Sequence, residues 1–156
     1  MDNRKYKQSI YFDTDIIINY FKEGDIGKHA RKVISQAKKM CKNPEVIVKV
    51  PLIVLGELTM ISMKKEKIDL SKLLKRELDA EFTSPNKESY TIAFRLMNED
   101  KLLEAADSLL VAQALTDKIS EWLITTDTKL INNLIISKIK EELRSKLKIS
   151  DRFGIG

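Results

Sequence analysis

The feature that most constrains the fold is an alternation of short apolar runs with longer segments of helical spacing. Residues 9–13 (SIYFD), 46–50 (VIVKV) and 121–126 (EWLITT) are brief and rich in β-branched or aromatic residues, as buried strands are. Residues 80–83 and 146–150 are predicted as shorter strands, the last at an edge. Because strands that alternate with helices form parallel sheets, the sequence predicts an α/β fold: a three-layer α/β/α sandwich with a mostly parallel sheet of four to five strands.

The segments between these runs are predicted to be helices. Pro51 suits the first turn of the helix that follows the second strand, and Asp25 occupies the N-cap position of an earlier one. Asp69 or Ser71 would cap the helix that begins near residue 70. The predicted helical segments are residues 15–21, 25–42, 51–61, 69–79, 87–98, 105–118 and 129–146.

Length, composition and charge exclude several classes of protein. A chain of 156 residues with 43% hydrophobic residues can bury a core without disulfides, and we expect a single domain, 1–156. One cysteine and one histidine exclude a zinc finger. The apolar stretches are interrupted by charges before they reach membrane-spanning length, and the first residues lack an apolar leader core, so we expect a cytoplasmic protein without a membrane segment. The net charge of +5 fits a polyanionic partner such as RNA and equally a solvated lysine-rich surface.

Acidic residues follow the predicted strands at the positions where α/β proteins bind ligands. Asp13 closes the first strand, Asp15 follows two residues later, and Asp127 comes directly after residues 121–126. In a parallel sheet the ligand crevice lies beyond the carboxyl ends of the strands. Each acid alone also fits a turn or cap: Asp15 could begin a helix, and Asp127 could cap the predicted helix from residue 129.

Two more acids interrupt apolar helical stretches. Glu57 stands in VPLIVLGELTM and Asp107 in EAADSLLVAQA, where a buried carboxylate is costly unless something pairs with it. A salt bridge or a helix-dipole role would satisfy one acid. Several acids at one sheet edge instead indicate a hard divalent cation, Mg²⁺ or Mn²⁺. His29, on a charged helix, and Cys41, near a helix end, offer no competing catalytic set.

These segments together resemble the PIN-domain family, the small metal-dependent ribonuclease fold found in VapC-type toxins. YFDTDIIINYF resembles the opening strand with its first acid, here Asp13, and VPLIVLGELTM resembles the helix that carries the second, Glu57. AADSLLVAQAL resembles the Ala-rich helix led by an acid, Asp107. WLITTDTKL resembles the Thr-x-Asp closure, with Thr125 and Asp127. Asp15 departs from the pattern, because many members have Asn there.

The resemblance implies a reaction and the residues that perform it. The expected reaction is hydrolysis of RNA phosphodiester bonds by a water that Mg²⁺ or Mn²⁺ activates. Thr14 or Thr125 would orient a water or ligand, and Asp15 would add negative charge. Glu104 is either an outer acid of the site or an exposed residue at a helix start. The implied catalytic, metal-binding acids are Asp13, Glu57, Asp107 and Asp127.

The resemblance also implies partners. These are an RNA substrate, a second copy of the chain in a homodimer and, if the protein is a toxin of a toxin–antitoxin pair, an antitoxin protein. The apolar stripe of Ile16, Ile17, Tyr20 and Phe21 could serve such an interface or pack on the sheet.

Two other functions fit parts of the sequence. One is a PIN fold kept as a non-catalytic RNA-binding or assembly module. The other is a haloacid dehalogenase-like phosphatase, in which Asp13 of the Asp-x-Asp motif would be a nucleophile. That family usually has Thr directly after the motif, where this chain has Ile16.

Overall fold

The computed structural model describes residues 5–65 and 68–154, and over these residues the fold is built on a five-stranded parallel sheet. The strand order is β3-β2-β1-β4-β5, which confirms the predicted α/β class and makes the sheet wholly parallel. The predicted domain, 1–156, extends over residues 1–4, 66–67 and 155–156, which lie outside the described residues. The strands are β1 (Gln8–Phe12), β2 (Val46–Pro51), β3 (Glu81–Thr83), β4 (Ser120–Ile124) and β5 (Lys148–Ser150).

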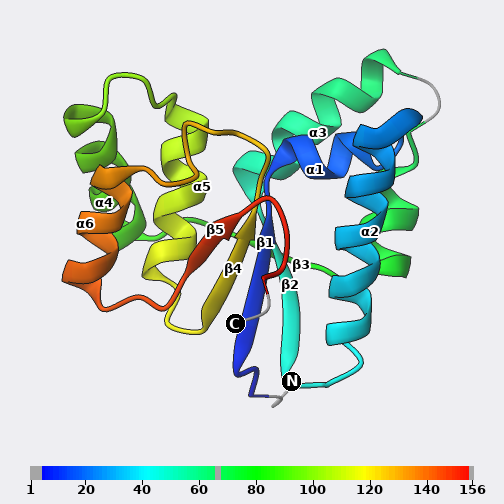
Figure 1. Cartoon of the computed structure of the whole chain (residues 1–156), viewed down its shortest axis with the longest axis horizontal. Helices are drawn as coiled ribbons and strands as arrows, with labels where there is room; N and C mark the ends of the chain where they lie inside the picture. Colours follow the sequence, from blue (N-terminus) through cyan, green and yellow to red (C-terminus); the bar gives the residue numbers. More distant parts are fainter. Residues whose placement is uncertain (1–4, 66–67, 155–156) are drawn as a thin grey trace.

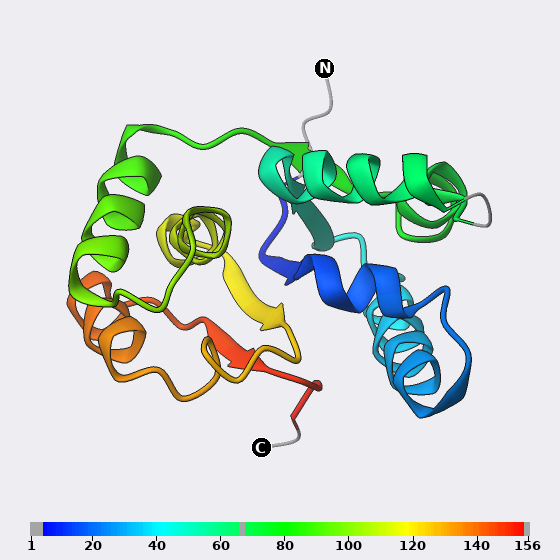
Figure 2. The ribbon, with the colours of Figure 1, turned by 90° about the horizontal axis from the view of Figure 1, so that it is seen from above.

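Helices cover both faces of the sheet. In Figure 1 the helices between β1 and β3 lie to the right of the sheet, and those that follow β3 lie to the left. Figure 2 shows the same separation from above. The helical elements are α1 (Thr14–Asn19), α2 (Gly24–Met40), α3 (Leu52–Lys64), the short π-helix η1 (Lys72–Glu77), α4 (Lys87–Glu99), α5 (Ala105–Thr116) and α6 (Leu134–Leu143). None of them combines the length and apolar character that crossing a bilayer requires, among the residues described.

The central strand explains where the site must lie. β1 pairs with β2 on one side and with β4 on the other, and Ile10 and Phe12 are fully buried. The residue that follows β1 therefore sits at the middle of the carboxyl edge. Ile16 and Ile17 of α1 are also fully buried, so the interface role considered for them is wrong, and they pack in the core.

The predicted helix 129–146 is wrong in its first third. Residues 128–132 form turns, in which the Leu130 amide donates to the Asp127 carbonyl at 3.0 Å. α6 begins only after Asn133, whose side chain accepts from the amides of Ile135 and Ile136. The helix ends at Leu143, and its C-cap Arg144 has a φ of 54°, in the left-handed region. The edge strand predicted at residues 146–150 is confirmed as β5, parallel to β4.

Two predicted caps are also wrong. Glu23, not Asp25, occupies the N-cap position of α2, and Asp25 lies within its first turn. Asp13, not Asp15, caps α1, because the chain turns into helix directly after β1. Asp15 is thereby free to bond elsewhere. At the segment 69–79, the helix is shorter than predicted and is a π-helix, with the Asp69 carboxylate accepting from the Lys72 amide at 3.0 Å.

Candidate active site

Asp13 is the most buried acid at the carboxyl edge of the sheet. The residue is only 7% exposed, and both of its carboxylate oxygens accept hydrogen bonds. Oδ1 accepts from the Thr14 amide at 2.7 Å, and Oδ2 accepts from the Thr125 hydroxyl at 2.8 Å. Burial, and then the nearby charges of Asp15 and Asp107, raise the pKa of Asp13 to about 7, because the two hydrogen bonds compensate only in part.

Glu57 reaches the same edge from α3. Its Oε1 accepts from the Thr14 hydroxyl at 2.9 Å, while the Thr14 amide donates to Asp13. Thr14 therefore links two of the predicted acids through its backbone and its side chain. The alternative that Glu57 is satisfied by a salt bridge finds no support among the described residues, because its hydrogen-bond partner is this hydroxyl.

Asp107 lies in the first turn of α5 and is half-buried. Burial raises its pKa most, and the charges of Asp127, Glu104 and Glu57 raise it further, while Lys129 opposes them. Since Asp107 in turn raises the pKa of Asp13, the structure brings all four predicted acids into one electrostatic neighbourhood. Their catalytic role stays a prediction.

The loop after β4 supplies Thr125, Thr126 and Asp127. The fully buried Thr125 hydroxyl donates to Asp13 and accepts from the Asp127 amide at 3.0 Å. Asp127 uses its Oδ1 to accept from the Lys129 amide at 2.9 Å, so it caps a turn and not the predicted helix. The Lys129 ammonium lies 4.0 Å from Asp127 Oδ2. Lys129 is a cation that sequence reasoning did not single out, although it follows the closing acid by two residues.

Asp15 and Glu104 surround these acids in different ways. One oxygen of Asp15 accepts from the amide of Thr126 at 3.0 Å and from its hydroxyl, which ties α1 to the loop after β4. The other oxygen is buried and has no hydrogen-bond partner among the described residues. Glu104 is exposed at the N-cap position of α5 and makes no side-chain cap bond there. Its charge nevertheless reaches Asp107.

The residues fit a hard divalent cation by their chemistry, although they do not surround a single point. Over residues 5–65 and 68–154, no three His, Cys, Asp or Glu side chains form a group that could hold a metal by itself. Mg²⁺, however, keeps several waters and needs only one or two protein carboxylates beside a substrate phosphate. Asp13 is a buried acid with a raised pKa and like-charged neighbours, and one oxygen of Asp15 has no hydrogen-bond partner among the described residues. A bound cation would compensate these negative charges.

Comparison with known families decides the relationship. The model of the PIN domain matches residues 10–133, a span that contains Asp13, Glu57, Asp107 and Asp127. The chain belongs to the PIN-domain family. PIN domains are mostly metal-dependent nucleases, and the phosphatase alternative is therefore set aside. A search of curated proteins found no match to the chain.

Proposed function

We propose that this PIN domain is a metal-dependent endoribonuclease and that Asp13, Glu57, Asp107 and Asp127 form its active site. The observation that carries the proposal is the electrostatics of Asp13. It is a buried carboxyl whose pKa is raised to about 7 by burial and by two further acids. Lys129 opposes this negative charge in part: its ammonium lies 4.0 Å from Asp127 Oδ2 and lowers the pKa of Asp107. Clusters of acids left uncompensated in this way are typical of sites that bind a metal.

The mechanism follows from how the chain holds its acids. A bound Mg²⁺ or Mn²⁺ supplies positive charge and a water of lowered pKa. Asp13 is fixed in orientation by the Thr14 amide and the Thr125 hydroxyl, and Glu57 by the Thr14 hydroxyl. Asp107 and Asp127 approach from α5 and from the loop after β4. Lys129, 44% exposed at its side chain, is placed to contact a substrate phosphate.

The choice of substrate and partners extends the proposal. The family indicates a nucleic-acid substrate, whose phosphates suit a chain of net charge +5, and from the resemblance to PIN-domain ribonucleases we infer that it is RNA. A homodimer, an antitoxin partner and a toxin role are consistent with the family resemblance. A lack of cleavage together with retained RNA binding would indicate the non-catalytic module instead.

The test is cleavage of labelled single-stranded RNA and DNA in Mn²⁺, Mg²⁺ or EDTA. The variant is Asp107→Asn, which keeps the shape of the side chain and removes its charge. Asp25→Asn, at an exposed first-turn position of α2, is the matched control. We expect RNA cleavage that requires metal, survives in Asp25→Asn and is lost in Asp107→Asn. Equal cleavage by both variants would refute this active site.

A further inference from the structure

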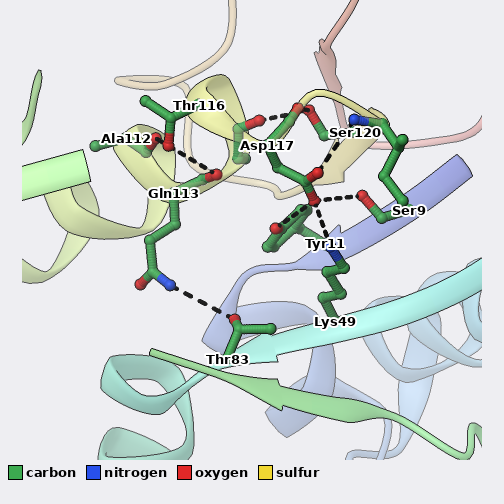
Figure 3. Close-up of polar contacts among 11 residues, drawn as sticks. Ser9, Tyr11, Lys49, Thr83, Ala112, Gln113, Thr116, Asp117 and Ser120 are labelled. Atoms are coloured by element: carbon green, nitrogen blue, oxygen red, sulfur yellow. Dashed lines mark hydrogen bonds and ion pairs between the residues drawn. The ribbon is translucent and has the colours of Figure 1, made fainter. Parts of the chain in front are cut away.

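A second polar cluster lies beside the sheet, away from the four acids. Asp117, directly after α5, accepts three hydrogen bonds at Oδ2, as Figure 3 shows. The donors are the hydroxyls of Ser9 and Tyr11, both at 2.8 Å, and the Lys49 ammonium at 2.9 Å. Oδ1 accepts from the Ile119 amide at 3.1 Å. The carboxylate and the ammonium neutralise each other within this cluster.

The Asp117 cluster forms one wall of a polar pocket of about 240 Å³. β1, β2 and the end of β3 contribute one side, and the last turn of α5 contributes the other. The segment between β3 and α4 completes the lining with Ser84 and Asn86. None of the four candidate catalytic acids lines it. The volume is below the roughly 300–1,000 Å³ of drug-sized ligand pockets, so it suits one ring-sized group.

Gln113 is a lining side chain with a buried oxygen that the described residues leave without a hydrogen bond. The residue is only 6% exposed, and its Oε1 has no hydrogen-bond partner among the described residues. Its Nε2 lies 3.5 Å from the Thr83 hydroxyl, a long contact. Figure 3 shows the amide extending from α5 toward Thr83, at the end of β3. A buried acceptor without a donor is costly, so the amide is suited to a ligand that supplies one.

We propose that this pocket binds one nucleobase, preferentially adenine, through the Gln113 amide. The side chain presents an acceptor and a donor next to each other. That pair matches the N6 amino group and N7 of adenine, which glutamine recognises in two simultaneous hydrogen bonds. An anion is disfavoured, because Lys49, the cation that lines the pocket, is already neutralised by Asp117.

The pocket is placed to receive a base of a strand held at the acids. Gln113 follows Asp107 by six residues on α5, which is about 9 Å along the helix axis. Tyr11 lies in β1 two residues before Asp13, which directly follows that strand. This connection to a bound RNA strand rests on the proposed ribonuclease function. It deepens that function, because binding of a base in the pocket would create a preference for adenine near the cut.

The test measures binding and needs no catalysis. The whole metal-free protein is titrated with adenosine, with uridine, and with short single-stranded RNA that contains or lacks adenine, while its amide NMR spectrum is recorded. Gln113→Leu removes the amide, and Gln36→Leu, at a half-buried position of α2 outside the pocket, is the matched control. We expect shifts at Ser84, Asn86 and the Gln113 side chain. We expect binding about tenfold weaker in Gln113→Leu and unchanged in Gln36→Leu.

The different ligands show whether the pocket binds a free nucleoside or a base within a strand. Shifts with adenosine but not with RNA identify a site for the free nucleoside, and shifts only with adenine-containing RNA identify a site for a base within a strand. Either result supports the pocket. No shift at these residues with any ligand, or equal weakening in both variants, overturns it. Metal-dependent cleavage without pocket shifts refutes only this inference, whereas pocket shifts without cleavage refute only the ribonuclease.

Discussion

Asp13 directly follows the central strand β1, and Asp117 accepts hydrogen bonds from two side chains of that strand, yet the two carboxylates have opposite environments. Burial raises the pKa of the Asp117 carboxyl, but the hydrogen bonds from Lys49, Ser9 and Tyr11 outweigh it and hold that pKa below its usual value. Burial also raises the pKa of Asp13, and there the neighbouring charges of Asp15 and Asp107 add to the effect. The fold neutralises one carboxylate and leaves the other among like charges.

Under the proposed function, this difference separates a structural acid, Asp117, from a functional one, Asp13. A buried carboxylate with a cation at 2.9 Å needs no ligand to be stable. A buried carboxylate held by hydroxyl and amide donors among other acids is suited to receive positive charge from outside the chain. α5 connects the two clusters, because Asp107, the neighbour of Asp13, lies in its first turn and Asp117 follows its last residue.

The largest expected effect is on activity at the uncompensated acid. Asp13→Asn should lower RNA cleavage about 1,000-fold or more, because a catalytic metal contributes several kcal/mol to the transition state. Asp117→Asn should leave kcat near that of the unaltered protein once folding is confirmed. Initial rates in Mn²⁺ at a temperature where both variants are folded provide the measurement. Comparable losses in the two variants would break the distinction between the clusters.

The same difference predicts opposite responses of folding to pH. In EDTA, ionising Asp13 destabilises the fold, so this residue lowers stability as pH rises from about 4 to its folded pKa of about 7. The shift of about three pKa units corresponds to about 4 kcal/mol at most. The pKa of Asp117 is lowered in the fold, so this residue stabilises the fold when the pH is above its pKa in the unfolded chain. That contribution is lost as pH falls through the folded pKa.

Urea unfolding at several pH values measures this. Asp13→Asn should reduce the decline between pH 4 and 7 and leave the part due to Asp107, whose pKa is also raised. The decline persisting unchanged in this variant would mean that Asp13 does not cause it.

The sequence predicted the fold and the neighbourhood of the acids for a physical reason. Strand alternation and buried carboxylates in apolar stretches are local signals, and parallel strands bring their ends to one edge. The pairing of Lys49 with Asp117 joins positions 68 residues apart, so no local pattern reveals it. A signal existed, because Lys49 is the one charged residue of its strand and required a partner.

The errors came from competition between local preferences. Residues 129–133 directly precede a run of helix formers, but the Asp127 side chain bonds to the Lys129 amide and favours a turn, and Asn133 caps the helix that starts after it. Asp15 was a plausible cap by position, yet Asp13 is nearer the strand end and caps α1. The unsatisfied Gln113 was missed because a single glutamine in an apolar helix carries no pattern.

Breaking the Asp117–Lys49 pair should lower the free energy of unfolding by less than the ionisation of Asp13 does. Asp117→Asn leaves the Lys49 ammonium without its anion at side chains only 17% and 12% exposed. We expect a loss of about 3 kcal/mol, at the lower end for a broken buried pair. Adding Lys49→Met should recover much of it, because the unpaired charge is then gone. Denaturant unfolding of both single variants and the double variant closes the cycle, and purely additive losses would show that the pair is not coupled.

The smallest expected effect is stabilisation by the metal itself. A cation that binds only the folded chain at about 100 times its Kd adds about 2.7 kcal/mol and raises Tm. Asp13→Asn should weaken that increase, whereas Asp117→Asn, although less stable, should retain it in full. Calorimetric scans with Mn²⁺ against EDTA compare the three proteins. An increase that is equal in all of them would place the metal outside the Asp13 cluster and remove the physical basis for treating the two acids differently.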